Sequence, residues 1–233
     1  PSGDPELRKL VAEKLSRERN MTVTADDMVL TSGSGEAIGI VIQALTDPGD
    51  VVLVEEFVYL GTLNQMRRYG ADCVGIKCDD DGIIPEDLDS VITEQKAKGK
   101  KVKYLYTIPA FQNPMGWTMS LERRKQVLEV TGKHGIPVFE DDCYADLRFS
   151  GEDVTSFHSL DDTGRVVYVG SFSKIIAPGM RMGYLVAPKD VIARAWSFKS
   201  GGAVSQFTAL TIAEFMKGNV NRHIEEQNEA LIA

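Results

Sequence analysis

The sequence predicts an α/β fold in which helices cover both faces of a mainly parallel, mixed sheet, as a three-layer α/β/α domain. Three observations support this class. Short apolar runs with strand composition alternate with segments whose apolar residues recur at helical spacing. Such alternation is typical of buried, mainly parallel sheets. The chain also lacks internal repeats and linker-like stretches, so one large domain should hold most of it.

The predicted strands are short runs of mainly apolar or β-branched residues that follow one another at intervals filled by helical patterns. They cover residues 28–31, 51–54, 73–77, 102–107, 137–140, 166–169 and 183–186.

The predicted helices are marked by start signals and apolar stripes. Asp4 and Pro5 are typical of an N-cap and a first helical position. The stripe that follows holds one polar residue, Lys14, among Leu7, Leu10, Val11 and Leu15. A helix after the small-residue turn 32–35 has the stripe Ala37, Ile40, Val41, Ala44 and Leu45.

Four further helices complete the alternation. Ser120 is a predicted N-cap, and the helix after it has an inner side made of Leu121, Val127, Leu128 and Thr131. The other three cover residues 60–69, 85–98 and 220–233.

The composition restricts partners and compartment. With 233 residues and 43% hydrophobic content, the chain can bury one sizeable core. Its net charge of −8 disfavours nucleic acid or an anionic membrane as the main partner. Three scattered cysteines and three histidines without ligand spacing predict neither a disulfide framework nor a metal site. Since no apolar run approaches the ~20 residues of a membrane span, we expect a cytoplasmic protein.

The two ends of the chain look like parts of a longer polypeptide. It opens at Pro1 instead of a methionine, and it closes inside a helical pattern. We therefore expect residues 1–25 to lead into a large domain at 26–215, and residues 216–233 to begin a second, smaller domain.

Lys174 is the most informative residue. It lies in the string Gly170-Ser-Phe-Ser-Lys174, with Arg181 seven residues later, in a loop between two predicted strands. Lysine acts covalently when its amine is held near a carbonyl and partly stripped of water. Hydroxyls and a guanidinium beside such an amine favour a phosphorylated carbonyl compound, and pyridoxal 5'-phosphate is the obvious candidate. A solvated surface lysine is the alternative interpretation.

Three other loops carry residues suited to the same cofactor. Ser34 lies in a Gly/Ser turn that opens a helix, where backbone amides and the helix dipole favour a phosphate. Tyr59 could stack on a planar ring. Asn113 could donate to a phenolate oxygen. Pro114 restricts the conformation of Asn113, and the peptide bond between these two residues could be cis. Taken singly, these features are also compatible with an ordinary tight turn, a packed tyrosine and a Pro/Gly-rich connection.

Asp141 and Asp142 follow the strand predicted at 137–140. A carboxylate there can pair with a protonated pyridine nitrogen. Because adjacent strand side chains point to opposite faces, only one of the two can do so. A helix-capping turn and a divalent-metal site are alternatives, and the metal is less favoured because no histidine or further carboxylate clusters nearby in sequence.

Together these loops resemble the fold-type I pyridoxal-phosphate aminotransferases of class I and II. The closest likeness is to the 2-aminoadipate and kynurenine aminotransferase subgroup and to the aminotransferase-like halves of MocR-type regulators. It covers about residues 1–190 and is carried by Gly33-Ser34, Tyr59, Gln112-Asn113-Pro114-x-Gly116, Asp141-Asp142-x-Tyr144 and Ser171-Phe-Ser173-Lys174 with Arg181.

The resemblance implies a role for each residue. Lys174 would form the internal aldimine and shuttle a proton. Asp141 would pair with the ring nitrogen, since the family places its tyrosine three residues after the key aspartate and Tyr144 fits. Asn113 and Tyr144 would contact the phenolic oxygen, and Tyr59 would stack on the ring. The phosphate would be held by Ser34, the Gly35 amide, Ser171, Ser173 and Arg181.

The function implied is transfer of an amino group between an α-amino acid and a 2-oxo acid by a homodimer in amino acid metabolism. A lyase, decarboxylase or racemase on the same scaffold remains an alternative, as does the ligand-sensing domain of a MocR-type transcription regulator. The sequence departs from the family at Gly35, where many relatives have Gln, and at Phe57, where many have Pro. The family's arginine for the substrate carboxylate belongs to a C-terminal region outside this sequence.

Overall fold

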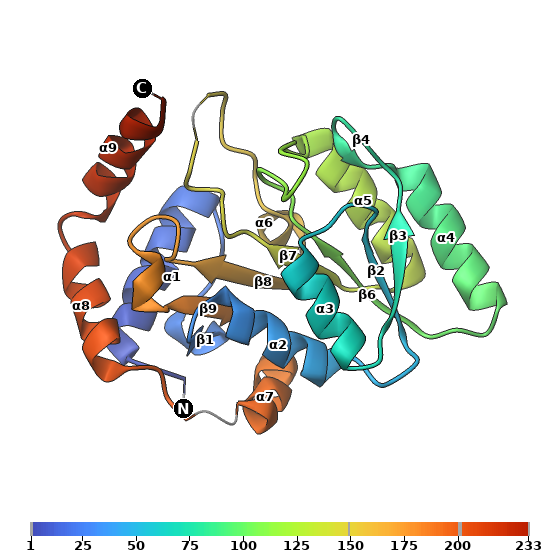
Figure 1. The fold of residues 1–233 in the computed structure, drawn as a ribbon, viewed down its shortest axis with the longest axis horizontal. Coiled ribbons are helices and arrows are strands. Elements are labelled where there is room, and N and C mark those ends of the chain that lie inside the picture. The colour runs from blue at the N-terminus through green and yellow to red at the C-terminus, as the bar shows by residue number, and fades with distance from the viewer. Residues whose placement is uncertain (1, 149, 200–201, 233) are drawn as a thin grey trace.

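A seven-stranded sheet forms the centre of the computed structural model, which describes residues 2–148, 150–199 and 202–232 (Figure 1). Its strand order is β1-β9-β8-β7-β6-β2-β3. All seven predicted strands are present, and their ends agree to within two residues. Their bounds are β1 Met28–Thr31, β2 Val51–Glu55, β3 Asp72–Ile76, β6 Val102–Thr107, β7 Val138–Asp141, β8 Val166–Ser171 and β9 Gly183–Val186.

The sheet is mixed, as predicted. Strands β3, β2, β6, β7 and β8 are parallel, whereas β9 runs antiparallel to both β8 and β1. The link from β8 to β9 contains only the 3-10 turn Pro178–Met180, which is too short for the crossover that a parallel neighbour requires. Strands β1, β2, β6, β7 and β8 therefore direct their carboxyl ends to one edge of the sheet.

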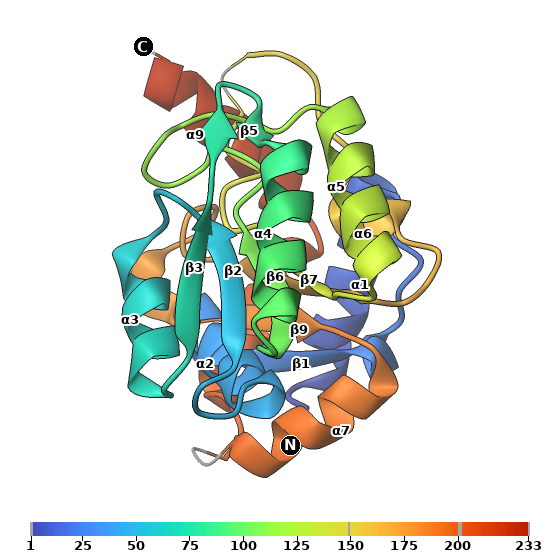
Figure 2. The ribbon, with the colours of Figure 1, turned by 90° about the vertical axis from the view of Figure 1, so that its right-hand side faces the viewer.

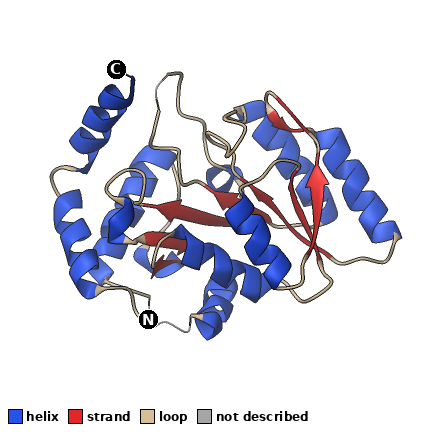
Figure 3. Ribbon diagram, in the orientation of Figure 1, coloured by secondary structure: helices blue, strands red, loops and turns tan. Residues whose placement is uncertain are grey.

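Helices cover both faces, which confirms the predicted α/β/α layers (Figure 3). Seen from the β3 edge, α3 lies on one side of the sheet and α4 and α5 lie on the other (Figure 2). The first side carries α2 Ser34–Leu45, α3 Leu60–Arg68 and α7 Lys189–Phe198. The second carries α1 Pro5–Arg19, α4 Pro85–Ala97, α5 Leu121–His134, α6 Phe157–Leu160 and α8 Gln206–Met216. The chain continues into α9 Val220–Ile232.

Side chains of the central strands alternate between the two faces. Tyr104 and Tyr106 of β6 pack with α2 and α3, whereas Leu105 between them packs with α4 and α5. This two-residue period also decides where polar side chains at the strand ends point.

Several short elements were not predicted from the sequence. They are the small hairpin of β4 Cys78–Asp79 and β5 Gly82–Ile83, and the helices α6, α7 and α8. Strands of two residues are too short to show a periodic pattern. Pro1, where the predicted segment 1–25 begins, and Ala233, where the predicted segment 216–233 ends, lie outside the described residues.

Leu121 departs from its expected role, whereas Lys14 lies in the buried stripe as expected. Leu121, expected on the inner side of α5, is 41% exposed, because it occupies the first position of the helix at its free end. Arg124 instead takes the buried place, where its guanidinium donates to the Met119 and Pro109 carbonyls at 3.1 and 3.0 Å. Lys14, the one polar residue of the α1 stripe, is buried and pairs with Glu18 and Asp146 at 2.6 and 2.9 Å.

None of the helices within the described ranges combines the length and the apolar character that a membrane crossing requires.

Candidate functional site

One cavity of about 440 Å³ lies at the carboxyl edge of the sheet. The cavity is lined mainly by residues that follow β1, β2, β6, β7 and β8, and the last of these loops leads into β9. The structure brings together all ten predicted site residues around this cavity: Ser34, Gly35, Tyr59, Asn113, Asp141, Tyr144, Ser171, Ser173, Lys174 and Arg181.

One end of the cavity is suited to an anion. Ser34 is the first residue of α2, so free backbone amides and the positive end of the helix dipole face this region. Arg181 reaches the same place and donates to the Ser173 hydroxyl and the Ser32 carbonyl, both at 3.4 Å. Since these partners are neutral oxygens, the guanidinium keeps its charge available to a phosphate.

Two glycines allow this close approach. A Cβ atom at Gly33, whose φ is +82°, would lie 2.2 Å from the Arg181 guanidinium, and one at Gly183 would lie 2.6 Å from the Ser34 amide nitrogen. A Cβ atom at Gly35, in contrast, would meet nothing within 4 Å. The sequence departure at Gly35 is therefore not imposed by lack of space.

Asp141, the last residue of β7, presents an unpartnered acceptor. Its Oδ2 accepts a hydrogen bond from the Tyr106 hydroxyl at 2.6 Å, whereas its buried Oδ1 has no hydrogen-bond partner among the described residues. Burial raises the pKa of this carboxyl, while the proximity of Cys143 and the hydrogen bond from Tyr106 lower it. A buried acceptor without a donor fits a ligand that brings an N–H group, as a protonated pyridine ring does.

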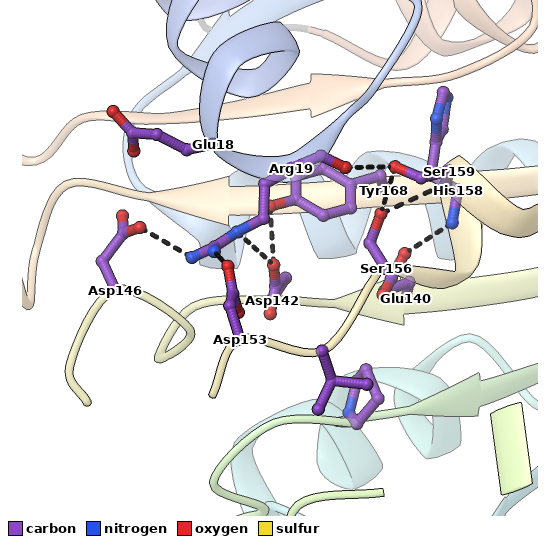
Figure 4. Close-up of polar contacts among 12 residues, drawn as sticks. Glu18, Arg19, Glu140, Asp142, Asp146, Asp153, Ser156, His158, Ser159 and Tyr168 are labelled. Atoms are coloured by element: carbon purple, nitrogen blue, oxygen red, sulfur yellow. Dashed lines mark hydrogen bonds and ion pairs between the residues drawn. The ribbon is translucent and has the colours of Figure 1, made fainter. Parts of the chain in front are cut away.

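Asp142 points to the opposite face of the sheet. Its Oδ2 accepts from the Tyr168 hydroxyl at 2.8 Å and lies 3.7 Å from Arg19 Nε at the end of α1 (Figure 4). The alternation of adjacent side chains thus places Asp141 in the cavity and Asp142 in a buried charge cluster outside it.

The remaining predicted residues converge beside Asp141. Asn113 Nδ2 donates to the Tyr144 hydroxyl at 3.2 Å, and the Lys174 amine lies 5.7 Å from the centre of the Tyr144 ring. Tyr59, which precedes α3, is 48% exposed at the cavity wall. The Asn113–Pro114 peptide bond is cis.

The sequence did not identify every residue of the site, and the missed lining residues are Ile38, Gly61, Thr62, Gln65, Ile108, Cys143 and Pro178. Behind the lining, Tyr106 donates to Asp141, and Glu55 accepts from the backbone amide of Ile108. Cys143 could have been inferred, because it lies between two predicted site residues. Tyr106 shares a sheet face with Asp141, but a tyrosine within a predicted strand indicates only a packed core residue. Within the described ranges, no three His, Cys, Asp or Glu side chains gather as metal ligands.

The mixed sheet with a cavity at its carboxyl edge, together with the similarity to solved aminotransferases, identifies a fold-type I protein. The family model for aminotransferase class I and II matches residues 1–233, so the chain belongs to this family. Aromatic-amino-acid aminotransferase 1 of Thermococcus litoralis is 39% identical over 186 residues, which are 80% of this chain and 45% of that protein.

A solved structure and a regulator are also similar. Pyrococcus horikoshii kynurenine aminotransferase, in complex with PMP, KYN and KYA, matches with a TM-score of 0.92 and 35% identity, over 98% of this chain and 57% of that one. The uncharacterized HTH-type transcriptional regulator YisV of Bacillus subtilis is 31% identical over 245 residues, which cover 100% of this chain and 49% of the regulator. The chain spans about half the length of the curated relatives it matches.

Proposed function

We propose that the protein is a pyridoxal-phosphate-dependent aminotransferase that moves an amino group from an α-amino acid to a 2-oxo acid. The observation that carries this proposal is the unpartnered Oδ1 of Asp141 in the same cavity as Lys174 and the anion cradle at Ser34 and Arg181. These groups match a ring nitrogen, an aldehyde and a phosphate, the three reactive or charged parts of one cofactor.

The residues have distinct tasks in this proposal. Bound pyridoxal phosphate supplies an electron-withdrawing ring that stabilises negative charge at the substrate Cα. The Asp141 carboxylate keeps a proton on the ring nitrogen, which strengthens that withdrawal. Asn113 and Tyr144 bind the phenolic oxygen, and Tyr59 packs against the ring. The Lys174 amine would hold the cofactor through its aldehyde carbon, with loss of water, and once free would move a proton between Cα and C4'.

The phosphate is held by the start of α2 and by the loop before β9. The Ser34 hydroxyl and Gly35 amide donate from the helix terminus, and Arg181 supplies the opposite charge. Ser171 and Ser173 complete the cradle with hydroxyl groups. Their loop is shaped by a hydrogen bond of 3.1 Å from the Ser173 amide to the Ser171 hydroxyl.

The same proposal extends to the assembly and its surroundings. We infer a homodimer, as the resemblance implies, with residues 216–233 beginning a second domain. Cys73, Cys78 and Cys143 are free thiols, which supports the cytoplasm as the compartment. Sedimentation of the full-length protein tests the homodimer, and fractionation of its native cells tests the compartment.

The decisive variant is Lys174→Ala, with the exposed α7 lysine in Lys189→Ala as the matched control. Full-length wild type and the control should carry pyridoxal phosphate on Lys174 after borohydride reduction, seen by peptide mass, and should transaminate with 2-oxoglutarate as acceptor. Lys174→Ala should lose both properties while keeping its fold. A fully active Lys174→Ala variant would contradict the proposal.

A second candidate function is ligand sensing within a transcription regulator, favoured by the match to YisV over the whole chain. A sensor would take up the cofactor and bind amino acids but produce little keto acid. A screen of amino donors against 2-oxoglutarate separates the two functions, because only an aminotransferase accumulates glutamate. Release of carbon dioxide or change of chirality without glutamate would indicate the other Cα reactions.

A further inference from the structure

We propose that Tyr106 is a positioning residue that fixes the Asp141 carboxylate and turns its free oxygen toward the cavity. The proposal rests on the function proposed above, because it assigns that oxygen to the cofactor's ring nitrogen. Tyr106 is fully buried, and its hydroxyl donates to Asp141 Oδ2 at 2.6 Å. The other oxygen, Oδ1, is thereby the one left for a ligand.

The direction of the hydrogen bonds follows from counting protons. A phenol has one O–H proton, and Tyr106 gives it to the Asp141 carboxylate. The Thr62 hydroxyl, 3.2 Å from the Tyr106 oxygen, must therefore be the donor in that contact. Thr62 lies in the first turn of α3, and its amide donates to the Tyr59 carbonyl at 3.1 Å. A directed chain of hydroxyls thus connects α3 through β6 to β7.

The Tyr106 hydroxyl also favours the charged form of Asp141. Burial raises the pKa of Asp141, and the charge of Asp142 adds to this effect, while the proximity of Cys143 and the hydrogen bond from Tyr106 oppose it. Glu55 is a further acid close enough to interact, and Lys174 and Arg181 face the same cavity. A donor on Oδ2 favours the ionised carboxylate, so the shared proton resides on the ring nitrogen instead of on Asp141.

The chain contains a closely matched control in Tyr104. It lies two residues earlier on β6, on the same face, and is also fully buried. Its hydroxyl lies 3.2 Å from that of Thr46, and its ring meets Phe139 edge-on, as does the ring of Tyr106. Tyr104 makes no hydrogen bond to Asp141 among the described contacts. Removing either hydroxyl therefore costs one buried Tyr–Thr contact, but only one removal affects Asp141.

The experiment compares Tyr106→Phe, Tyr104→Phe and Asp141→Asn in the full-length protein. Binding of pyridoxal phosphate is measured by absorbance titration, and the protonation of its ring nitrogen by ¹⁵N NMR of labelled, bound cofactor. Tyr106→Phe should move the ¹⁵N shift toward the unprotonated value, in the direction of Asp141→Asn, and raise Kd about tenfold. Tyr104→Phe should match wild type in both measurements.

The outcomes separate this inference from the proposed function. Equal ¹⁵N shifts and Kd values in Tyr106→Phe and Tyr104→Phe would overturn the role of Tyr106 while leaving the cofactor assignment intact. Failure of wild type to bind pyridoxal phosphate would overturn both. If Tyr106→Phe does not fold, Thr62→Val serves instead, since loss of the donor to Tyr106 should shift the ¹⁵N signal in the same direction by a smaller amount. An unchanged signal in that variant would also refute the proposal.

Discussion

At the residue scale, Asp141 and Asp142 show how one position along a strand changes what a carboxylate does. Asp141 presents a free oxygen to the cavity, whereas Asp142 accepts from Tyr168 and lies beside Arg19. The first arrangement leaves an acceptor for a ligand, and the second satisfies a charge within the fold. Neutralising Asp141 should therefore affect mainly activity, whereas neutralising Asp142 should affect mainly stability.

We expect Asp141→Asn to reduce transamination strongly with little loss of stability, because the oxygen that it alters at Oδ1 has no partner within the fold and awaits a ligand. Asp142→Asn should instead retain much of the activity and lose about 1–3 kcal/mol of unfolding free energy, since Arg19 loses a buried partner. Initial rates and urea unfolding of both variants test this, and each serves as the control for the other. Equal effects on both measurements would refute the division of roles.

The sequence identified site residues where residue type and position agreed. Lys174 and Asp141 were found because reactive or charged side chains at strand ends are informative in an α/β sheet. Tyr106 and Thr62 were missed because their hydroxyls act from within elements whose pattern indicates only packing. Their contact joins residues 44 positions apart, which no local pattern reveals.

At the element scale, β2 ends in a carboxylate that joins two loops of the cavity. Glu55 is buried and accepts hydrogen bonds from the Thr107 hydroxyl at 2.5 Å, the Ile108 backbone amide at 3.0 Å and the Gln112 side-chain amide at 2.6 Å. Gln112 also donates to the Phe57 carbonyl at 2.6 Å. The loops that carry Tyr59 and Asn113 are thus held through one acid.

Stability should depend on the ionisation of Glu55. Burial raises its pKa from 4.5 to about 7, against the hydrogen bonds from Thr107, Gln112 and Ile108. The folded chain then binds more protons than the unfolded chain between these values, so the unfolding free energy should fall as pH rises from 4.5 to 7. Glu55→Gln removes this contribution, so its stability relative to wild type should improve as pH rises through the same window.

Urea unfolding over that pH range provides the measurement, with the adjacent, exposed Glu56 as control in Glu56→Gln. Burial also raises the pKa of Glu140 to about 7, so the unfolding free energy of every variant should still fall somewhat with rising pH. Parallel pH profiles for wild type and Glu55→Gln would show that Glu55 does not titrate in this window.

The elements themselves were predictable to different degrees. The seven strands were found because each is a compact apolar run between turn residues, and α1 and α5 because Asp4 and Ser120 cap them through hydrogen bonds to Leu7 and Arg123. The antiparallel direction of β9 was not assigned, although the short link from β8 requires it. The helix α7 was missed because few of its residues are buried.

At the scale of the whole molecule, ion pairs join α1 to the loop that follows β7 in the site. The charged residues that form them would be assigned to the surface from their sequence pattern. The Arg19 guanidinium lies among the carboxylates of Asp142, Asp146 and Asp153, all more than 120 positions away (Figure 4). Burial alone would raise the pKa of Asp146, but the charges of Lys14 and Arg19 hold it below its usual value. This cluster fixes the segment that follows Asp141.

Arg19→Met should therefore be strongly destabilising, by about 3–5 kcal/mol, because it leaves buried carboxylates without their cation. Asp146 retains Lys14 and Asp153 retains Arg148, whereas Asp142 loses its ion-pair partner. The cost of Arg19→Met should consequently be smaller in an Asp142→Asn background, and a double-mutant cycle by urea unfolding measures the difference. Arg17→Met, on the same helix but exposed, should change stability by less than about 1 kcal/mol. If the two arginine variants cost the same, or if the cycle shows no coupling, the cluster does not hold α1 to the loop of the site.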